Sequence, residues 1–101
     1  GTMVGINTIS SEVPSQYALK QNYPNPFNPS TKINFDIPKK GFVSLKIYNS
    51  QGKEVADLVN NDLSPGSYTY EFNASSLASG LYFYKLQTGD FLETKKMLLI
   101  K

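Results

Sequence analysis

The sequence predicts an all-β fold, an antiparallel β-sandwich of about seven short strands. Apolar residues alternate with polar ones along several segments, as they do in a sheet with one buried face. Tyrosine and phenylalanine supply all the aromatic residues, which make up 13% of the chain and suit a pleated surface. Turn-forming clusters interrupt the alternation about every 8–12 residues, which is the spacing typical of a sandwich. The length of 101 residues indicates one domain with a single core.

Residues 1–16 are predicted to lie outside the folded domain. Gly1–Met3 look like a vector scar, and residues 4–16 have the polar composition of a linker. The sandwich is therefore expected to span residues 17–101, with a short strand near its start.

Residues 21–31 are predicted to form a stiff, ordered loop. The segment contains three prolines, which exclude a helix and a central strand. These prolines are Pro24, Pro26 and Pro29. The side chains of Tyr23 and Phe27 are expected to plug into the core. A cis peptide bond before Pro24 is compatible with the sequence.

The strands expected after this loop follow from the alternation of apolar and polar residues. The apolar positions of three strands are Ile33, Phe35 and Ile37; Val43, Leu45 and Ile47; and Tyr68, Tyr70 and Phe72. Further strands are expected over residues 54–59, 81–88 and 91–100. Turns are expected at residues 38–41, 49–52, 60–66 and 89–90, and a single helical turn is expected at 74–80.

Two glycine positions precede a tyrosine at the start of a strand. They belong to Gly66-Ser67-Tyr68 and Gly80-Leu81-Tyr82. One of these tyrosines is a candidate tyrosine corner, in which the hydroxyl group binds nearby backbone. Two strands that simply begin after a glycine turn explain the pattern equally well. Gly52, in the turn at 49–52, is expected to adopt positive φ.

The composition excludes most catalytic chemistries. The chain contains no His and no Cys, so the usual general base and the thiolate nucleophile are missing. Neither a Gly-x-Ser-x-Gly elbow nor a glycine-rich phosphate loop occurs. The net charge of +2 comes from lysine without arginine, and the lysines form no cluster in the sequence, so nucleic-acid binding is not expected. We expect no enzymatic activity and no cofactor.

Two polar segments have weaker functional interpretations. Asn60-Asn61-Asp62 carries oxygen atoms of the kind that bind Ca²⁺, but the EF-hand pattern is absent and a polar turn is the simpler interpretation. Asn73-Ala74-Ser75 fits the N-glycosylation triplet, which also occurs by chance.

The last strand has an excess of apolar residues after Lys95 and Lys96. One face holds Leu92, Thr94, Lys96, Leu98 and Ile100, and the other holds Phe91, Glu93, Lys95, Met97 and Leu99. A sandwich strand with one buried face should keep alternating. Two explanations remain open: a bulge near Lys95 or cover by the N-terminal segment, or a partner that contacts Met97 and Leu99.

Five segments, in this order, resemble the type A C-terminal sorting domain of the type IX secretion system of Bacteroidetes and related bacteria. They are Leu19–Thr31, Val43–Gly52, Leu63–Tyr68, Ser79–Tyr84 and Lys95–Lys101. Each segment is weakly specific, but together they are strongly specific and are distributed from Leu19 to Lys101. The motif residues are Asn22, Pro24, Asn25, Pro26, Phe27, Asn28, Pro29, Gly52, Pro65, Gly66, Tyr68, Gly80 and Tyr82.

The resemblance implies an immunoglobulin-like β-sandwich that serves as the sorting signal of a larger exported protein. This parent protein is expected to enter the periplasm by a signal peptide, pass the type IX outer-membrane translocon and reach the cell surface or the medium. A sortase-like surface protease is expected to cut in or near the linker before Tyr17. The strand hypothesised to be recognised by translocon components consists of Lys95, Lys96, Met97, Leu98, Leu99, Ile100 and Lys101.

Two other functions are compatible with a small sandwich. A carbohydrate-binding or adhesive module would present aromatic side chains such as Phe42, Tyr48 and Phe83, although the chain has no Trp. A structural spacer would resemble the immunoglobulin-like domain of flagellar hook-capping scaffolds, which shares the glycine-rich turn pattern. An exposed last strand would also allow two copies to pair as a homodimer.

Overall fold

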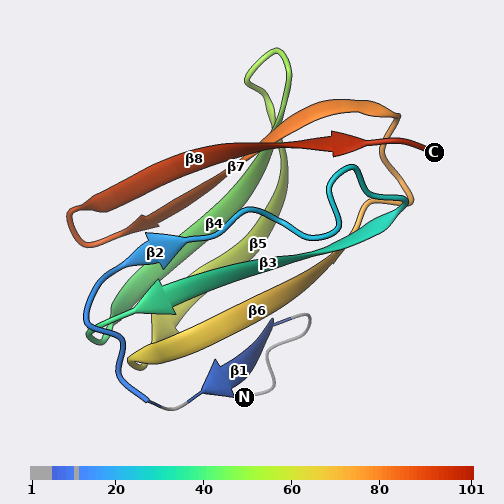
Figure 1. Ribbon diagram of the computed structural model, residues 1–101. Coiled ribbons are helices and arrows are strands. Elements are labelled where there is room, and N and C mark those ends of the chain that lie inside the picture. Colours follow the sequence, from blue (N-terminus) through green and yellow to red (C-terminus); the bar gives the residue numbers. More distant parts are fainter. Residues whose placement is uncertain (1–5, 11) are drawn as a thin grey trace.

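The computed structural model describes residues 6–10 and 12–101, which form eight strands (Figure 1). These strands are β1 (Ile6–Ser10), β2 (Ala18–Leu19), β3 (Ser30–Ile37), β4 (Gly41–Asn49), β5 (Glu54–Leu63), β6 (Gly66–Asn73), β7 (Gly80–Thr88) and β8 (Phe91–Leu99). They form two four-stranded sheets with the orders β1-β6-β3-β2 and β5-β4-β7-β8. All the described strand pairs are antiparallel, so the predicted sandwich is confirmed. The predicted vector scar, Gly1–Met3, lies outside the described residues.

Strand β1 lies inside the segment that the sequence analysis interprets as a linker. It pairs with β6, with Ile6 opposite Tyr70 and Thr8 opposite Tyr68. Ile6 is buried, whereas the following side chains up to Ile9 are exposed. Among the described side chains of β1, at residues 6–9, one is buried, and such a strand has the composition of a polar linker, which explains why the pattern did not reveal it. The polar segment thus contributes an eighth strand beyond the predicted number.

The core lies between the two sheets and is built from the faces that the alternation predicts. The side chains with 0% exposure are Ile33, Phe35, Ile37, Val43, Leu45, Ile47, Tyr84 and Leu86. Each buried side chain of this size stabilises the fold by about 1.5–3 kcal/mol relative to an exposed one. Strand β7, apolar on both faces in sequence, is central in its sheet between β4 and β8.

Two predicted turns differ from the structure. Residues 74–80 contain no helix; one turn closes where the Leu77 N–H donates to the Ala74 carbonyl at 3.0 Å. The turn expected at 60–66 begins later, because β5 continues to Leu63 and pairs with β4 as far as Gly41. The pairing partner, rather than local turn propensity, determines where β5 ends.

The turn at Asn49–Gly52 is confirmed. The Gly52 N–H donates to the Asn49 carbonyl at 2.9 Å, and Gly52 has a φ of 84°. The Asn49 side-chain oxygen accepts hydrogen bonds from the N–H groups of Gln51 and Lys53. Glycine adopts this left-handed conformation without the steric cost of a Cβ atom.

Both Gly-x-Tyr motifs form the hydrogen bond of a tyrosine corner. The Tyr68 hydroxyl donates to the Ser64 carbonyl at 2.6 Å, and the Tyr82 hydroxyl donates to the Ala78 carbonyl at 2.7 Å. In each case the acceptor lies four residues upstream. These bonds fasten the segments that lead into β6 and β7, one in each sheet.

Candidate recognition surface

The loop at residues 21–31 lies along the outer edge of β8. The Phe27 N–H donates to the Leu98 carbonyl at 3.0 Å, and the Ile100 N–H donates to the Phe27 carbonyl at 3.0 Å. These bonds create a short parallel bridge between Phe27 and Leu99. The loop therefore covers the edge of β8 near its end, as an added strand would.

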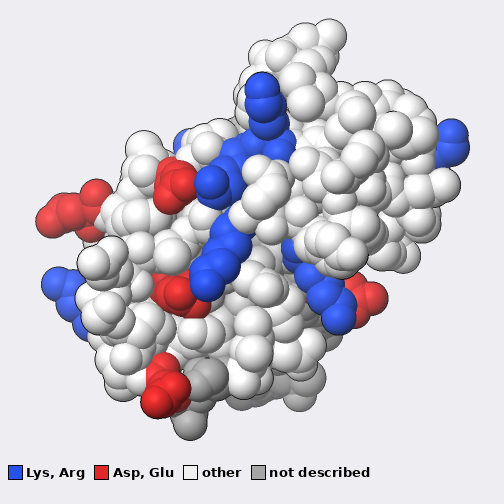
Figure 2. Space-filling model, viewed as in Figure 1, with Lys and Arg blue, Asp and Glu red and all other residues white. Residues whose placement is uncertain are grey.

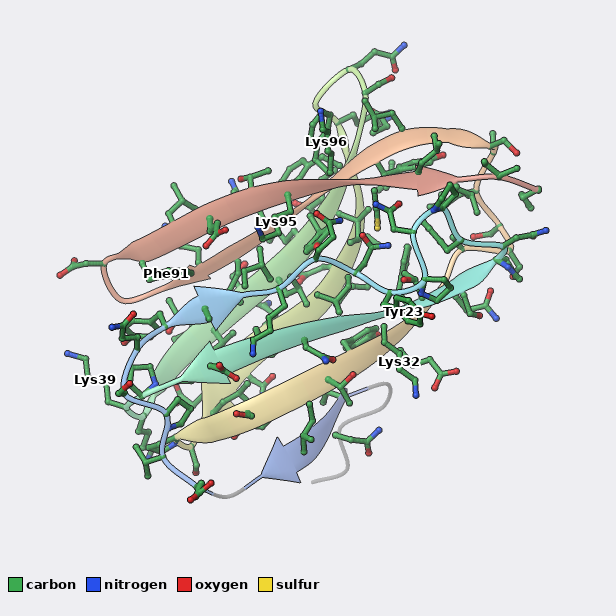
Figure 3. All side chains as sticks on the ribbon, in the orientation of Figure 1. Tyr23, Lys32, Lys39, Phe91, Lys95 and Lys96 are labelled. Atoms are coloured by element: carbon green, nitrogen blue, oxygen red, sulfur yellow. The ribbon has the colours of Figure 1, made fainter. Side chains whose placement is uncertain are left out.

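Phe27 fills the core as predicted, but the prediction for Tyr23 is wrong. Phe27 is 2% exposed, whereas Tyr23 is 80% exposed and points away from the body (Figure 3). Tyr23 forms an isolated antiparallel bridge with Lys32, through two backbone hydrogen bonds of 3.0 and 2.9 Å. Its neighbour Asn22 is buried, and successive side chains in extended backbone point to opposite sides. Burial of Asn22 therefore turns Tyr23 outward.

Two side chains fasten the loop to the backbone of β8. The Asn25 Oδ1 accepts a hydrogen bond from the Leu98 N–H at 3.0 Å. The Gln21 Nε2 donates to the Lys96 carbonyl at 2.9 Å. The backbone groups of β8 from Lys96 onward are thus engaged by this chain's own loop. Edge-to-edge pairing of two copies, which stays a prediction, would have to use the earlier part of β8.

Asn22 and Tyr84 connect this loop to the second sheet. The Tyr84 hydroxyl accepts a hydrogen bond from the Asn22 N–H at 2.8 Å and donates to the Lys20 carbonyl at 2.7 Å. The Asn22 Nδ2 donates to the Thr31 hydroxyl at 3.0 Å and to the Pro24 carbonyl at 3.2 Å. Burial raises the pKa of Tyr84 to about 12. The phenol therefore stays neutral and can act as donor and acceptor at once.

Strand β8 alternates regularly, which contradicts two of the explanations of its apolar excess, the bulge near Lys95 and a partner that contacts Met97 and Leu99. Its register with β7 shows no shift, so there is no bulge near Lys95. Met97 and Leu99 are 1% exposed and belong to the core instead of facing a partner. The large apolar side chains left exposed in this segment are Leu92, Leu98 and Ile100. Met97 is opposite Tyr82, whose side chain also points inward, and this register fixes which apolar residues stay outside.

The three lysines of the hypothesised strand have different surroundings. The Lys95 ammonium lies 3.2 Å from the Glu93 carboxylate, and Lys96 is exposed opposite Phe83 (Figure 3). The Lys101 ammonium donates to the carbonyls of Ser75 and Leu77 at 2.7 and 2.8 Å. Figure 2 shows lysine side chains gathered in a band on the face that carries β2 and β8. Of these three lysines, Lys96 is the one whose ammonium contacts no hydrogen-bond or ion-pair partner among the residues that the structure describes.

The structure brings only some of the predicted motif residues together. Gly80 and Tyr82 lie opposite Leu99 and Met97 in β7, which pairs with the edge of β8 that faces away from the loop. Gly52 lies in the β4–β5 turn, and Pro65, Gly66 and Tyr68 lie at the start of β6 in the other sheet. These four residues shape the sandwich and do not belong to the surface around β8.

The sequence pattern does not reveal that Gln21, Thr31 and Tyr84 take part in the hydrogen bonds that hold the loop at residues 21–31 in place. A polar hydroxyl in a strand that is apolar on both faces was the available signal, because a buried tyrosine needs a hydrogen-bond partner. Only the fold identifies that partner as the backbone of the distant loop.

The remaining candidate sites receive little support. Asn60–Asp62 lie in β5, and no cluster of three or more His, Cys, Asp or Glu suited to a metal occurs in the described part of the chain. Tyr48 is opposite Phe83, and the Lys85 ammonium lies 5.0 Å from the Tyr48 ring, but Phe42 is near the other end of β4. The described residues include no helix that is long and apolar enough to span a membrane.

A family model described as the secretion system C-terminal sorting domain matches residues 21–101. A search of curated proteins found no match to the chain. The matched region begins with the loop that covers β8 and includes both sheets apart from β1 and β2.

Proposed function

The chain belongs to the family of secretion system C-terminal sorting domains, and from this premise we propose that the outward face of β8 near its end is recognised by the type IX translocon. As a member of this family, the sandwich is a type IX sorting signal, attached to a parent protein that is exported to the cell surface or secreted. The family is one of sorting signals and not of enzymes. The proposal concerns which residues of the domain the translocon contacts.

One observation carries this proposal: the end of β8 is fixed on three sides and exposed on the fourth. β7 pairs with one edge, the loop at residues 21–31 covers the other, and Met97 and Leu99 anchor the inner face. The outer face presents Lys96, Leu98 and Ile100. Leu98 is 39% exposed and Ile100 is 50% exposed. An apolar surface beside the exposed Lys96 side chain suits a partner that buries leucine-sized side chains and offers a carboxylate.

This division assigns different tasks to the residues of the hypothesised strand. Met97 and Leu99 hold the strand in place, and the side chain of Lys101 fastens its end to the turn at residues 75–77. The partner contacts the side chains of Lys96, Leu98 and Ile100. Lys95, partly buried and beside Glu93, belongs to the supporting set.

We also propose the route and the processing that the family implies. The parent enters the periplasm by a signal peptide, passes the translocon through this domain, and is separated from the domain by a sortase-like protease. The exposed residues of the segment before Tyr17 support that site of cleavage: Val13 is 65% exposed, and none of the residues 12–16 is buried. A protease needs an accessible, extendable segment, and this one fits that requirement.

The test is a reporter protein placed before the complete chain in a bacterium with a type IX system. The double variant Leu98→Asp with Ile100→Asp should leave most of the reporter in the periplasm, because two carboxylates would have to be buried in the complex. Leu92→Asp is the matched control, since Leu92 is 59% exposed on the same face of β8 but far from its end.

The purified variants should unfold within a few degrees of the unsubstituted protein, because all three side chains are exposed. Normal export of the double variant would contradict the proposal. Equal retention of the Leu92→Asp reporter would show that recognition is not localised at the end of β8.

A further inference from the structure

Strand β1 is held to the sandwich along a single edge. Within the described residues it pairs with β6 alone, from Ile6 opposite Tyr70 to Ser10 opposite Ser67 (Figure 1). Ile6 is 6% exposed and belongs to the core, whereas Ile9 is 56% exposed. Backbone hydrogen bonds and one buried side chain therefore hold this strand, which is the arrangement of an extended peptide added to a sheet edge.

Residues 12–16, in the segment that joins β1 to β2, contribute no buried side chain to the core. Residues 12–16 are not buried, and Val13, Pro14 and their neighbours line an open depression of about 790 Å³ together with Asp36 and Ser67. The chain packs against the sandwich again at Tyr17, whose ring stacks on that of Phe91 with the ring centroids 5.3 Å apart. Breaking the chain between these two anchors removes a covalent link but no packed side chain.

We propose that the outer edge of β6 is a strand-acceptor site whose ligand is the segment Ile6–Ser10, and that this segment stays bound after the chain is cut between residues 12 and 16. The inference deepens the proposed processing and rests on it for its biological meaning. Hydrolysis of one peptide bond consumes a water molecule and leaves a carboxylate after β1 and an ammonium group before β2. Both new charges lie in an exposed segment and stay hydrated.

The consequence is that cleavage and release become separate events. While the chain is intact, β1 is tethered next to its site, at an effective concentration in the millimolar range that is typical of short tethers. After the cut, the parent remains attached to the sorting domain only through the β1–β6 pairing. Release then depends on dissociation of the strand, and an extended peptide with an isoleucine at the position of Ile6 competes for the same edge.

The acceptor site can be tested with the full chain and a protease unrelated to secretion. A recognition sequence for a specific endoprotease is inserted between the exposed residues Ser15 and Gln16, and a fluorescent label is attached ahead of Ile6. After complete cleavage, the labelled fragment should elute with the domain in size-exclusion chromatography at micromolar concentration. Ile6→Asp should release the fragment, and the matched variant Ile9→Asp should retain it, since only Ile6 is buried.

A competition experiment gives a second readout that does not require a folded variant. An excess of synthetic peptide with the sequence of Ile6–Ser10 should displace the label from the cleaved wild-type protein, and the same peptide with Asp in place of the isoleucine at position 6 should not. Separation of the wild-type fragment at once on cleavage, or equal release by Ile6→Asp and Ile9→Asp, would overturn the acceptor site. Neither outcome depends on the translocon, so the result is distinguishable from failure of the export test.

Discussion

The phenol oxygen of Tyr84 accepts a hydrogen bond from the backbone N–H of Asn22 at 2.8 Å, across a sequence separation of 62 residues. The same hydroxyl donates to the Lys20 carbonyl at 2.7 Å, so one side chain of β7 satisfies two backbone groups in the segment after β2. Asn22 in turn holds Thr31 and the Pro24 carbonyl. The loop that covers the edge of β8 is thereby fixed from inside the sandwich.

Removal of this hydroxyl should destabilise the fold and loosen the loop. Tyr84→Phe leaves the buried Asn22 N–H without its partner, which costs about 1–3 kcal/mol, and also removes the part-buried hydrogen bond to the Lys20 carbonyl. Urea unfolding of the purified chain measures this loss. Tyr82→Phe is the matched control on the same strand: its partly buried hydroxyl makes one bond, to Ala78, and we expect a smaller loss. An equal loss in both variants would contradict the special role of Tyr84.

Stability should fall at alkaline pH because of the same side chain. Burial raises the pKa of Tyr84 to about 12, although the hydrogen bond from Asn22 lowers it. An unfolded tyrosine has a pKa of about 10. The folded state therefore holds this proton more tightly, so the contribution is intact below about pH 10 and is lost as the pH rises from about 10 to 12. The decline reaches at most about 1.4 kcal/mol per pH unit.

The comparison of wild type with Tyr84→Phe isolates this contribution. Burial also raises the pKa of Tyr68, and the hydrogen bond to Glu54 raises the pKa of Lys46. The contribution of each group to the free energy of unfolding therefore also falls as the pH rises, and both groups are still present in the variant. Urea midpoints from neutral pH to about pH 11 should converge for the two proteins as the pH rises. Parallel curves would show that Tyr84 does not titrate in this window.

The two aromatic residues of the loop should respond in opposite ways to truncation. Phe27→Ala removes a ring that is 2% exposed and leaves a cavity, at a cost of about 3–5 kcal/mol. Tyr23→Ala removes a ring that is 80% exposed and should change the free energy of unfolding by less than about 0.5 kcal/mol. Chemical denaturation of both proteins provides the measurement, and similar values for the two would refute the placement of the loop.

The side chain of Asn25 should protect one amide of β8 from exchange with solvent. Its Oδ1 accepts the Leu98 N–H at 3.0 Å, and Asn25→Ala should speed hydrogen exchange at Leu98 by about five- to tenfold, the equivalent of roughly 1 kcal/mol for one hydrogen bond. The exposed Asn28, three residues further on, serves as the matched control, and Asn28→Ala should leave this amide unchanged. Hydrogen exchange followed by NMR tests both variants. Unchanged protection of the Leu98 amide in Asn25→Ala would argue against the hydrogen bond from this amide to the Asn25 side chain.

Local residue patterns were sufficient to predict the fold class, most of the strands and the family resemblance. Alternation along β3 and β4 identified the inward residues correctly, because the two-residue period of a strand is a local property that needs no knowledge of its partner. The turn at Gly52 followed from the same kind of local chemistry. The five segments that resemble sorting domains agree with the family match over residues 21–101.

Tertiary structure alone decided which groups meet, since that depends on register and on partners distant in sequence. It placed Tyr23 outside and Phe27 inside, turned Met97 and Leu99 into the core, and added β1 to the edge of β6. A polar segment becomes a strand only where an unpaired edge accepts its backbone hydrogen bonds. An apolar residue becomes part of a surface only when the pairing of its strand leaves it outside, as the pairing with β7 does for Leu98.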